Sequence, residues 1–123
     1  LESDLLTIMC ACRNGTLADT EVKFSDGAAC CVIMASSGYP EHYEKGFAIT
    51  MPAETAANTY VAGAKRDNGR LLTSGGRVLG VTATAADLKS AVEKAYERVE
   101  SVQFENAFYR RDIGRRALEA LKQ

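Results

Sequence analysis

Apolar residues recur with helical spacing near the amino terminus of the chain. The positions i, i+3, i+4 and i+7 are occupied by Leu5, Ile8, Met9 and Cys12. We expect Ser3 to cap this helix and Asn14-Gly15 to end it, because serine accepts backbone hydrogen bonds at helix starts and glycine suits helix ends. The helix begins almost at residue 1 with no preceding strand, which indicates that the natural chain extends upstream.

The pattern becomes helical again from Asp87 onward. One stripe collects the apolar residues Leu88, Ala91, Val92, Ala95, Tyr96, Val99 and Val102. Charged side chains fill most other positions, so we predict an amphipathic helix capped by Asp87 or Thr84. A segment from 104 to 111 follows, and Asp112 is predicted to open a final helix. Its expected inward residues are Ile113, Ala117, Leu118 and Leu121.

Extended segments are predicted between these helices, where apolar residues alternate or run without interruption. The predicted strands are residues 22–24, 28–35, 47–51, 60–65, 70–73 and 77–82. Asn68-Gly69 predicts a hairpin turn between two of them. Residues 28–35 are all apolar, so we expect both faces of this strand to be covered. The pattern predicts an α+β fold with a mostly antiparallel sheet of about five or six strands and flanking helices.

Composition restricts the possible partners. With 15 Lys and Arg against 16 Asp and Glu, the net charge of -1 provides no large basic field for nucleic acid or an anionic membrane. No apolar run approaches the roughly 20 residues needed to cross a bilayer, and the start lacks the basic residues of a signal peptide. We therefore expect a cytoplasmic protein without a nucleic-acid or membrane partner.

Several residues with reactive or charged side chains receive structural interpretations. The cysteines, at 10, 12, 30 and 31, lack zinc-site spacing and are interpreted as small core residues. His42 has no second histidine and is expected in a solvent-facing loop. The four arginines at 110, 111, 115 and 116 could meet phosphate, but a solvated helix start is the favoured interpretation. We predict no catalytic residue and no metal ligand in this chain.

Gly75-Gly76-Arg77 is the main candidate for a ligand site. Two glycines permit close backbone approaches, so they can present Arg77 at the mouth of the strand that follows. The alternatives are a glycine bulge without a ligand and an Arg77 that pairs with an acidic residue of its own fold. A second candidate is the loop 36–46, which carries two tyrosines and Lys45, although ordinary surface loops share its composition.

Several motifs, in order along the chain, resemble the carboxy-terminal domain of the phosphoribosylamine-glycine ligase family, ATP-grasp enzymes also called glycinamide ribonucleotide synthetases. Together they extend over nearly the whole chain, which makes them more specific than any one motif. The motifs are Ser3-Asp4-Leu5-Leu6, Ala35-Ser36-Ser37-Gly38-Tyr39-Pro40, Tyr43-Glu44-Lys45-Gly46, Ala62-Gly63, Asn68-Gly69, Gly75-Gly76-Arg77-Val78-Leu79-Gly80-Val81-Thr82-Ala83 and Tyr109-Arg110-Arg111-Asp112-Ile113-Gly114.

This resemblance implies a function in purine biosynthesis. Residues 1–20 would end the ATP-grasp domain and provide a linker, and residues 21–123 would form the ligase C-terminal domain. The complete enzyme would use ATP and Mg²⁺ or Mn²⁺ to phosphorylate the carboxylate of glycine, and the amine of 5-phosphoribosylamine would then attack the acyl phosphate. Arg77, Lys45, Gly75 and Gly76 would be substrate-binding residues. The nucleotide site would lie in the missing amino-terminal and ATP-grasp domains, so this fragment is expected to bind no cofactor and to lack ligase activity.

The sequence departs from the family pattern at a few positions. Val61 and Ala64 stand where the family commonly has histidine and threonine, so no site role is assigned to them. Phe24 replaces a frequent tryptophan, and Ser37 replaces a frequent glycine or lysine. Two alternatives stay open: the corresponding domain of another ATP-grasp enzyme, such as the biotin carboxylase group, or a free-standing interaction module whose tyrosine loop contacts a partner.

Overall fold

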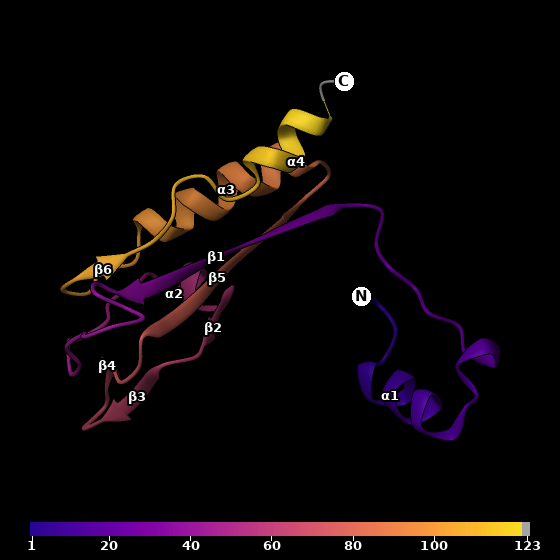
Figure 1. Cartoon of the computed structure of the whole chain (residues 1–123), viewed down its shortest axis with the longest axis horizontal. Coiled ribbons are helices and arrows are strands. Elements are labelled where there is room, and N and C mark those ends of the chain that lie inside the picture. The colour runs from indigo at the N-terminus through magenta and orange to yellow at the C-terminus, as the bar shows by residue number, and fades with distance from the viewer. Residues whose placement is uncertain (122–123) are drawn as a thin grey trace.

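A four-stranded antiparallel sheet forms the centre of the computed structural model, which describes residues 1–121 (Figure 1). Its two long strands, β1 (Ala28–Ser36) and β5 (Arg77–Ala85), pair with each other through most of their length. The short strand β2 (Thr59–Val61) flanks β5, and β6 (Ala107–Phe108) flanks β1. The predictions for β1 and β5 are confirmed, with β5 extending to Ala85.

A second, two-stranded sheet consists of β3 (Ala64–Asp67) and β4 (Arg70–Thr73). Asn68 and Gly69 both have positive φ angles, 47° and 79°, as a tight hairpin turn requires, so the predicted turn is confirmed. The predicted hairpin arm 60–65 is wrong in one respect, because it divides at Gly63: β2 joins the main sheet and β3 the small one. The six strands, in two sheets, confirm the α+β prediction.

The predicted strand 47–51 forms only isolated antiparallel bridges, one to β4 and one to Gln103. It leads into the short helix α2 (Ala53–Ala56), which follows Pro52. The predicted strand 22–24 is absent, since no neighbouring segment offers it a ladder of hydrogen bonds. A 3-10 turn, η1 (Leu17–Asp19), comes before it instead.

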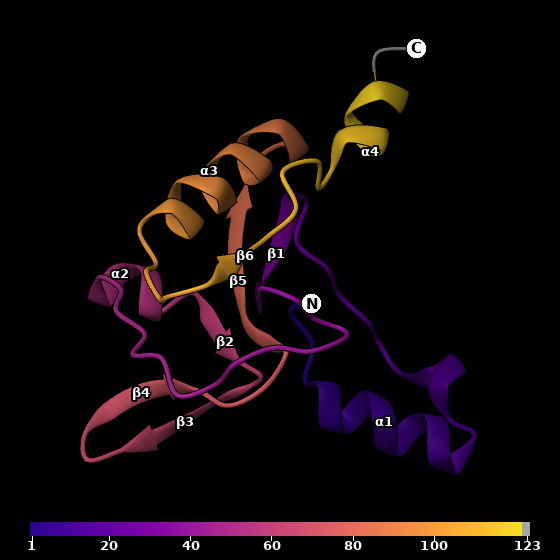
Figure 2. The same ribbon diagram turned by 60° about the vertical axis from the view of Figure 1, so that its left-hand side comes forward.

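Helix α3 (Leu88–Glu100) covers one face of the main sheet, as Figure 2 shows. Its predicted apolar stripe supplies the buried residues Ala91, Val92, Ala95 and Val99. The expectation that β1 is covered on both faces is wrong. Successive strand residues point to opposite faces, so Val32 and Met34 are buried under α3 while Cys31 and Ile33 are exposed on the open face. An uninterrupted apolar run in β1 therefore does not mean that both faces of the strand are covered.

Two aspartates cap the long helices. Asp87 accepts a hydrogen bond from the Ser90 backbone N–H (2.9 Å) at the start of α3, which confirms one of the two predicted caps. Asp4, and not the predicted Ser3, caps α1 (Leu5–Asn14) by accepting from the Thr7 N–H (2.7 Å). The side chain and backbone of Thr7 stabilise the charged Asp4, and the backbone and side chain of Ser90 stabilise the charged Asp87, so the pKa of both aspartates lies below the ordinary 3.8.

Ser3 has a different role from the predicted one. Its hydroxyl oxygen accepts a hydrogen bond from the Lys23 N–H (2.7 Å), because Asp4 already occupies the capping position. At its other end, α1 stops at Gly15, which adopts the left-handed conformation (φ 72°) and confirms the predicted end.

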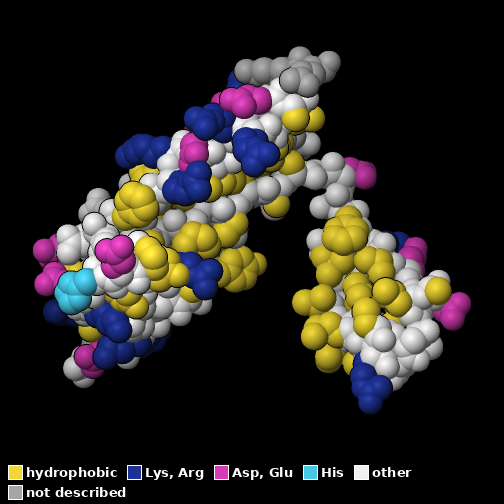
Figure 3. Space-filling view, viewed as in Figure 1, with side chains coloured by type: hydrophobic (Ala, Val, Ile, Leu, Met, Phe, Trp, Pro, Cys, Tyr) yellow, Lys and Arg dark blue, Asp and Glu magenta, His cyan; other side chains and the backbone are white. Residues whose placement is uncertain are grey.

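Helix α1 and the segment after it stand apart from the sheet (Figures 1 and 2). Within this part of the chain only Ala11 is buried, and the apolar side chains of the predicted stripe form an open surface (Figure 3). Its members Leu5 and Met9 are 59% and 60% exposed, and the neighbouring Leu6 is 68% exposed. No helix within residues 1–121 combines the length and apolar character needed to cross a membrane.

Of the four cysteines, only Cys30 fits the predicted core role. It is buried in the main sheet, and this burial raises the pKa of its thiol. Cys10, Cys12 and Cys31 are exposed, because α1 has no covering layer and Cys31 faces the open side of β1. His42 is exposed in the loop, as predicted.

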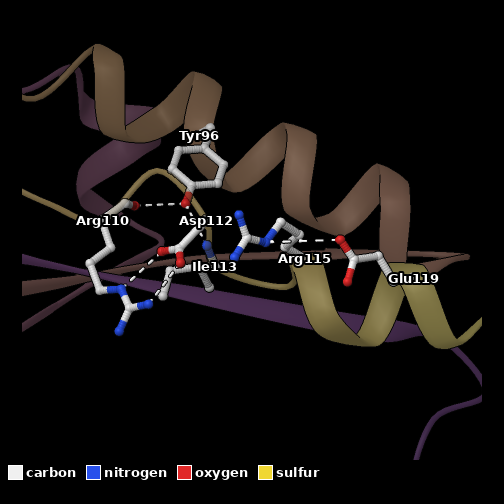
Figure 4. A network of polar contacts seen from close by, with 6 residues as sticks. All are labelled: Tyr96, Arg110, Asp112, Ile113, Arg115 and Glu119. Atoms are coloured by element: carbon white, nitrogen blue, oxygen red, sulfur yellow. Dashed lines mark hydrogen bonds and ion pairs between the residues drawn. The ribbon is translucent and has the colours of Figure 1, made fainter.

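Tyr96 of α3 forms hydrogen bonds with the segment that follows β6 (Figure 4). The Tyr96 hydroxyl donates to the Arg110 carbonyl (2.7 Å) and accepts from the Ile113 N–H (3.0 Å). Asp112 does not open the last helix as predicted, because its carboxylate instead pairs with the Arg110 guanidinium through two hydrogen bonds. These bonds lower the pKa of Asp112, and helix α4 (Arg115–Ala120) begins after Gly114.

The arginines of this segment are exposed, and three of them have local partners, Arg110 through its pair with Asp112. Arg111 lies over the Tyr109 ring at 5.1 Å from its centroid, and Arg115 pairs with Glu119 on α4 at 3.9 Å. These contacts agree with the interpretation of a solvated helix start. The predicted inward residues of α4 are less buried than expected, since Ile113 and Leu118 are half-buried while Ala117 and Leu121 are exposed.

We expect Tyr96→Phe to lower the free energy of unfolding by about 1–3 kcal/mol, because it leaves the part-buried Ile113 N–H without its acceptor. Urea denaturation followed by circular dichroism measures the change. Tyr60→Phe is the matched control: Tyr60 is 72% exposed, so water satisfies its hydroxyl and stability stays the same. Equal stability of Tyr96→Phe and the parent chain would contradict the assigned role of this hydroxyl.

Candidate functional site

The glycine pair before β5 packs closely against a third glycine. The Ser74 and Gly75 N–H groups both donate to the Gly63 carbonyl, at 2.7 and 3.0 Å. A Cβ atom on Gly63 would lie 2.8 Å from the Gly75 Cα and 2.4 Å from the Arg77 carbonyl oxygen. Only glycine at position 63 therefore allows the chain to pass this close to the start of β5.

The loop between β1 and residue 47 is held at both ends by this same turn. At its start, the buried Ser36 donates its N–H to the Gly76 carbonyl (2.8 Å) and its hydroxyl to the Gly75 carbonyl (3.1 Å). At its end, Gly46 donates its N–H to the Thr73 carbonyl (2.8 Å). The Phe47 N–H donates to the Thr73 hydroxyl (3.1 Å). Residues 73–76 thus hold both ends of this loop, a constraint that the sequence did not predict.

Aromatic contacts continue from the glycine turn to Lys45. The Tyr39 ring lies against Gly76 so closely that a Cβ there would be 1.9 Å from the ring atom Cδ2. Tyr39 meets Tyr43 edge to face, with ring centroids 5.9 Å apart. The Lys45 ammonium lies over the Tyr43 ring, 5.3 Å from its centroid, in a cation–π contact.

A shallow hollow of about 410 Å³ opens beside the glycine turn. Its lining residues are Ile33, Tyr39, Ala62, Gly63, Gly76 and Arg77. Arg77 is exposed and forms no ion pair with any residue in the range 1–121, so the alternative of an internal acidic partner is not what the structure shows. A guanidinium free of an internal partner can bind a phosphate or carboxylate through paired N–H groups.

The structure groups most of the predicted site residues. Gly76 and Arg77 line the hollow, and Gly75 forms the turn behind it. Lys45 is not among the lining residues and is connected to the hollow through the two tyrosines. Val61 and Ala64, where the sequence departs from the family pattern, lie outside the hollow. Val61 lines a different groove, and Ala64 packs against the core.

Sequence reasoning missed three residues of this site: Ser36, Tyr39 and Gly63. Ser36 and Tyr39 were part of the recognised loop motif, but their roles depend on contacts with residues almost 40 positions away. Gly63 had a usable signal, since an isolated glycine inside a predicted strand often marks a close backbone approach.

The polar side chains that line the hollow are those of Arg77 and Tyr39. None of the hollow's lining residues is a carboxylate, histidine or cysteine that could act as an acid, base or nucleophile. Within the described part of the chain, no group of three or more His, Cys, Asp or Glu side chains could hold a metal ion. The site therefore combines the Arg77 guanidinium with the apolar side chains of Ile33 and Ala62.

The chain is similar in sequence and structure to part of several phosphoribosylamine-glycine ligases. A phosphoribosylamine-glycine ligase from Rhizobium meliloti is 46% identical over 120 residues, and one from Leptospira interrogans is 39% identical over 120 residues. Each match covers 96% of this chain and 28% of the relative. The crystal structure of phosphoribosylamine-glycine ligase from Thermotoga maritima matches with a TM-score of 0.72 and 36% identity, covering 85% of this chain and 27% of that one. The chain thus spans less than a third of the length of these relatives.

A domain family gives the most direct assignment. Residues 29–116 match the family described as "Phosphoribosylglycinamide synthetase, C domain". This match decides against the C-terminal domain of the biotin carboxylase group, the first alternative from the sequence. It includes β1, the loop that follows it, the glycine turn and α3. The chain therefore belongs to the family of the phosphoribosylglycinamide synthetase C domain.

Proposed function

We propose that this chain is the substrate-facing C domain of a phosphoribosylamine-glycine ligase in purine biosynthesis. The complete enzyme would join 5-phosphoribosylamine to glycine and convert ATP to ADP and phosphate. The free guanidinium of Arg77 beside the apolar hollow is the observation that carries the proposal. Both substrates bear an anionic group, a phosphate or a carboxylate, that a guanidinium can bind.

We propose that residues 1–121 hold neither the nucleotide nor the metal of that reaction. They contain no metal-binding group of acidic, histidine or cysteine side chains. We therefore assign ATP and Mg²⁺, or Mn²⁺, to the preceding domains of the longer enzyme. This chain's contribution is to bind and orient a substrate from one side.

The uncovered apolar surfaces support a position next to other domains. Ile33 and Tyr60 on the open sheet side are 44% and 72% exposed, and α1 carries the exposed stripe described above. Apolar surface of this kind commonly marks a contact with another protein surface. We propose that the amino-terminal and ATP-grasp domains cover it and complete the pocket around Arg77.

Gly76 and Tyr39 would set the shape of that pocket. The Tyr39 ring occupies the space that a side chain at residue 76 would need. Tyr39 contacts Tyr43, and the Tyr43 ring contacts the Lys45 ammonium. The space that Gly76 leaves for Tyr39 would therefore also influence the position of the Lys45 cation. Lys45 is thereby a second, more distant positive charge for an anionic substrate.

In the complete ligase, Arg77→Ala should raise the KM for 5-phosphoribosylamine about 10- to 100-fold, because a charge-assisted hydrogen bond contributes about 1.5–3 kcal/mol. Arg77→Lys should recover part of this loss. Steady-state kinetics with each substrate varied in turn measures the effect. Arg116→Ala removes the same charge from α4 and should change neither KM. An Arg77→Ala enzyme with unchanged KM for both substrates would overturn the role of Arg77.

Gly76→Ala should lower the free energy of unfolding of the chain by about 1–3 kcal/mol, since the new methyl group overlaps the Tyr39 ring. Urea denaturation measures this loss. The same substitution in a Tyr39→Ala background should cost much less, because the ring is no longer there. Equal costs in the two backgrounds would show that the Tyr39 contact does not restrict residue 76.

The 123-residue chain alone should give no turnover of glycine, 5-phosphoribosylamine and ATP. A coupled assay for ADP release measures this, with the complete ligase as the positive control. ADP release that depends on both substrates would contradict the assignment of the nucleotide site to other domains.

A further inference from the structure

A second groove lies on the other side of the β2–β3 connection and plays no part in the proposed function. Its volume is about 620 Å³, which falls in the usual range of about 300–1,000 Å³ for small-molecule sites. Segment 48–51 and α2 form one side, and the β3–β4 hairpin forms the other. The Ile49 N–H donates to the Leu71 carbonyl (2.8 Å), so the floor is continuous.

The groove combines an apolar floor with positive charge at one side. Ile49 is buried, and Met51 and Leu71 are half-buried against the core. Arg66 and Arg70 both line the groove, and neither forms an ion pair within the part of the chain that the structure describes. None of the lining residues is acidic. Figure 3 shows Lys and Arg side chains gathered over this hairpin.

The register explains how Arg66 reaches the groove. Arg66 pairs with Leu71 across the hairpin, and directly opposite residues point to the same face of a sheet. Leu71 faces the core, so Arg66 extends over the apolar floor near the turn of the hairpin. Arg70 lies opposite Asp67, so its side chain leaves the strand on the other face. A charge at this position has two explanations: protection of the edge strand β3 against pairing with other chains, or binding of an anion.

We propose that this groove binds a small organic anion, whose apolar body lies on Ile49, Met51 and Leu71 while Arg66 binds its phosphate or carboxylate group. The proposal goes beyond the proposed function, since none of these residues lines the hollow at Arg77. Edge protection alone requires one inward charge and no ligand. It does not require a concave apolar floor whose lining contains no acidic residue, and these two features fit an amphiphilic anion better.

NMR titration of the complete 123-residue chain, labelled with ¹⁵N, tests the site with simple probes. Phenyl phosphate and benzoate carry both an apolar ring and a charge, whereas phenol lacks the charge and inorganic phosphate lacks the ring. We expect saturable binding of at least one charged aromatic probe with a Kd on the order of 1 mM, as suits its few atoms. The shifted amides should lie in 48–51 and 66–71. Phenol and inorganic phosphate should bind at least about tenfold more weakly.

Variants identify the residues responsible. Arg66→Ala should weaken binding of the charged aromatic probe about tenfold. Arg70→Ala should weaken it less, because Arg70 leaves its strand on the opposite face of the hairpin. Lys65→Ala removes the same charge from the same hairpin without touching the groove, and should leave Kd unchanged. Arg77→Ala should also leave it unchanged, which separates this site from the proposed substrate hollow. The ¹H–¹⁵N spectrum of each variant verifies its fold.

Three results would overturn the proposal. The first is an absence of saturable shifts in 48–51 and 66–71 with either charged aromatic probe. The second is equal binding of inorganic phosphate, which would indicate a simple ion site. The third is an equal loss of affinity in Lys65→Ala and Arg66→Ala, which would indicate a general effect of positive charge.

Discussion

Backbone hydrogen bonds to residues 73–76 organise the candidate site. Three separate segments meet this short turn: the end of β1 through Ser36, the start of segment 47–51 through Phe47, and the β2–β3 connection through Gly63. Residues 63 and 75 approach each other too closely for side chains, and the Tyr39 ring fills the space beside residue 76, which explains the three glycines. The turn therefore holds the loop 36–46 in place, with Tyr39 of that loop beside Arg77 in the lining of the hollow.

The arrangement also explains the one-sided character of the domain. Helix α3 and the carboxy-terminal segment, bound through Tyr96, cover one face of the main sheet. The other face keeps Cys31, Ile33 and Tyr60 exposed, and the hollow opens beside Ile33. A domain built this way leaves both its apolar surface and its free guanidinium uncovered on the same side.

Local features of the fold could be predicted from the sequence, and features that depend on distant contacts could not. The α3 stripe, the Asn68-Gly69 turn and the two long strands follow from spacing and turn chemistry within a few residues. The division of the predicted arm at Gly63, the open face of β1 and the pairing of Asp112 with Arg110 depend on which partners lie nearby. In the candidate site, Gly75, Gly76 and Arg77 could be predicted to lie together because they are adjacent, whereas the contacts of Tyr39 and Ser36 with the turn could not, because they cross the fold.

Amide hydrogen exchange measured by NMR tests most directly whether the glycine turn holds the loop. The N–H groups of Ser36 and Gly46 donate to carbonyls of residues 76 and 73, so the account predicts slow exchange, comparable to that of Val32 within β1. The exposed His42 in the middle of the loop should exchange fast. Exchange of Ser36 and Gly46 as fast as that of His42 would show that the loop is not fixed by the turn, and would contradict the account.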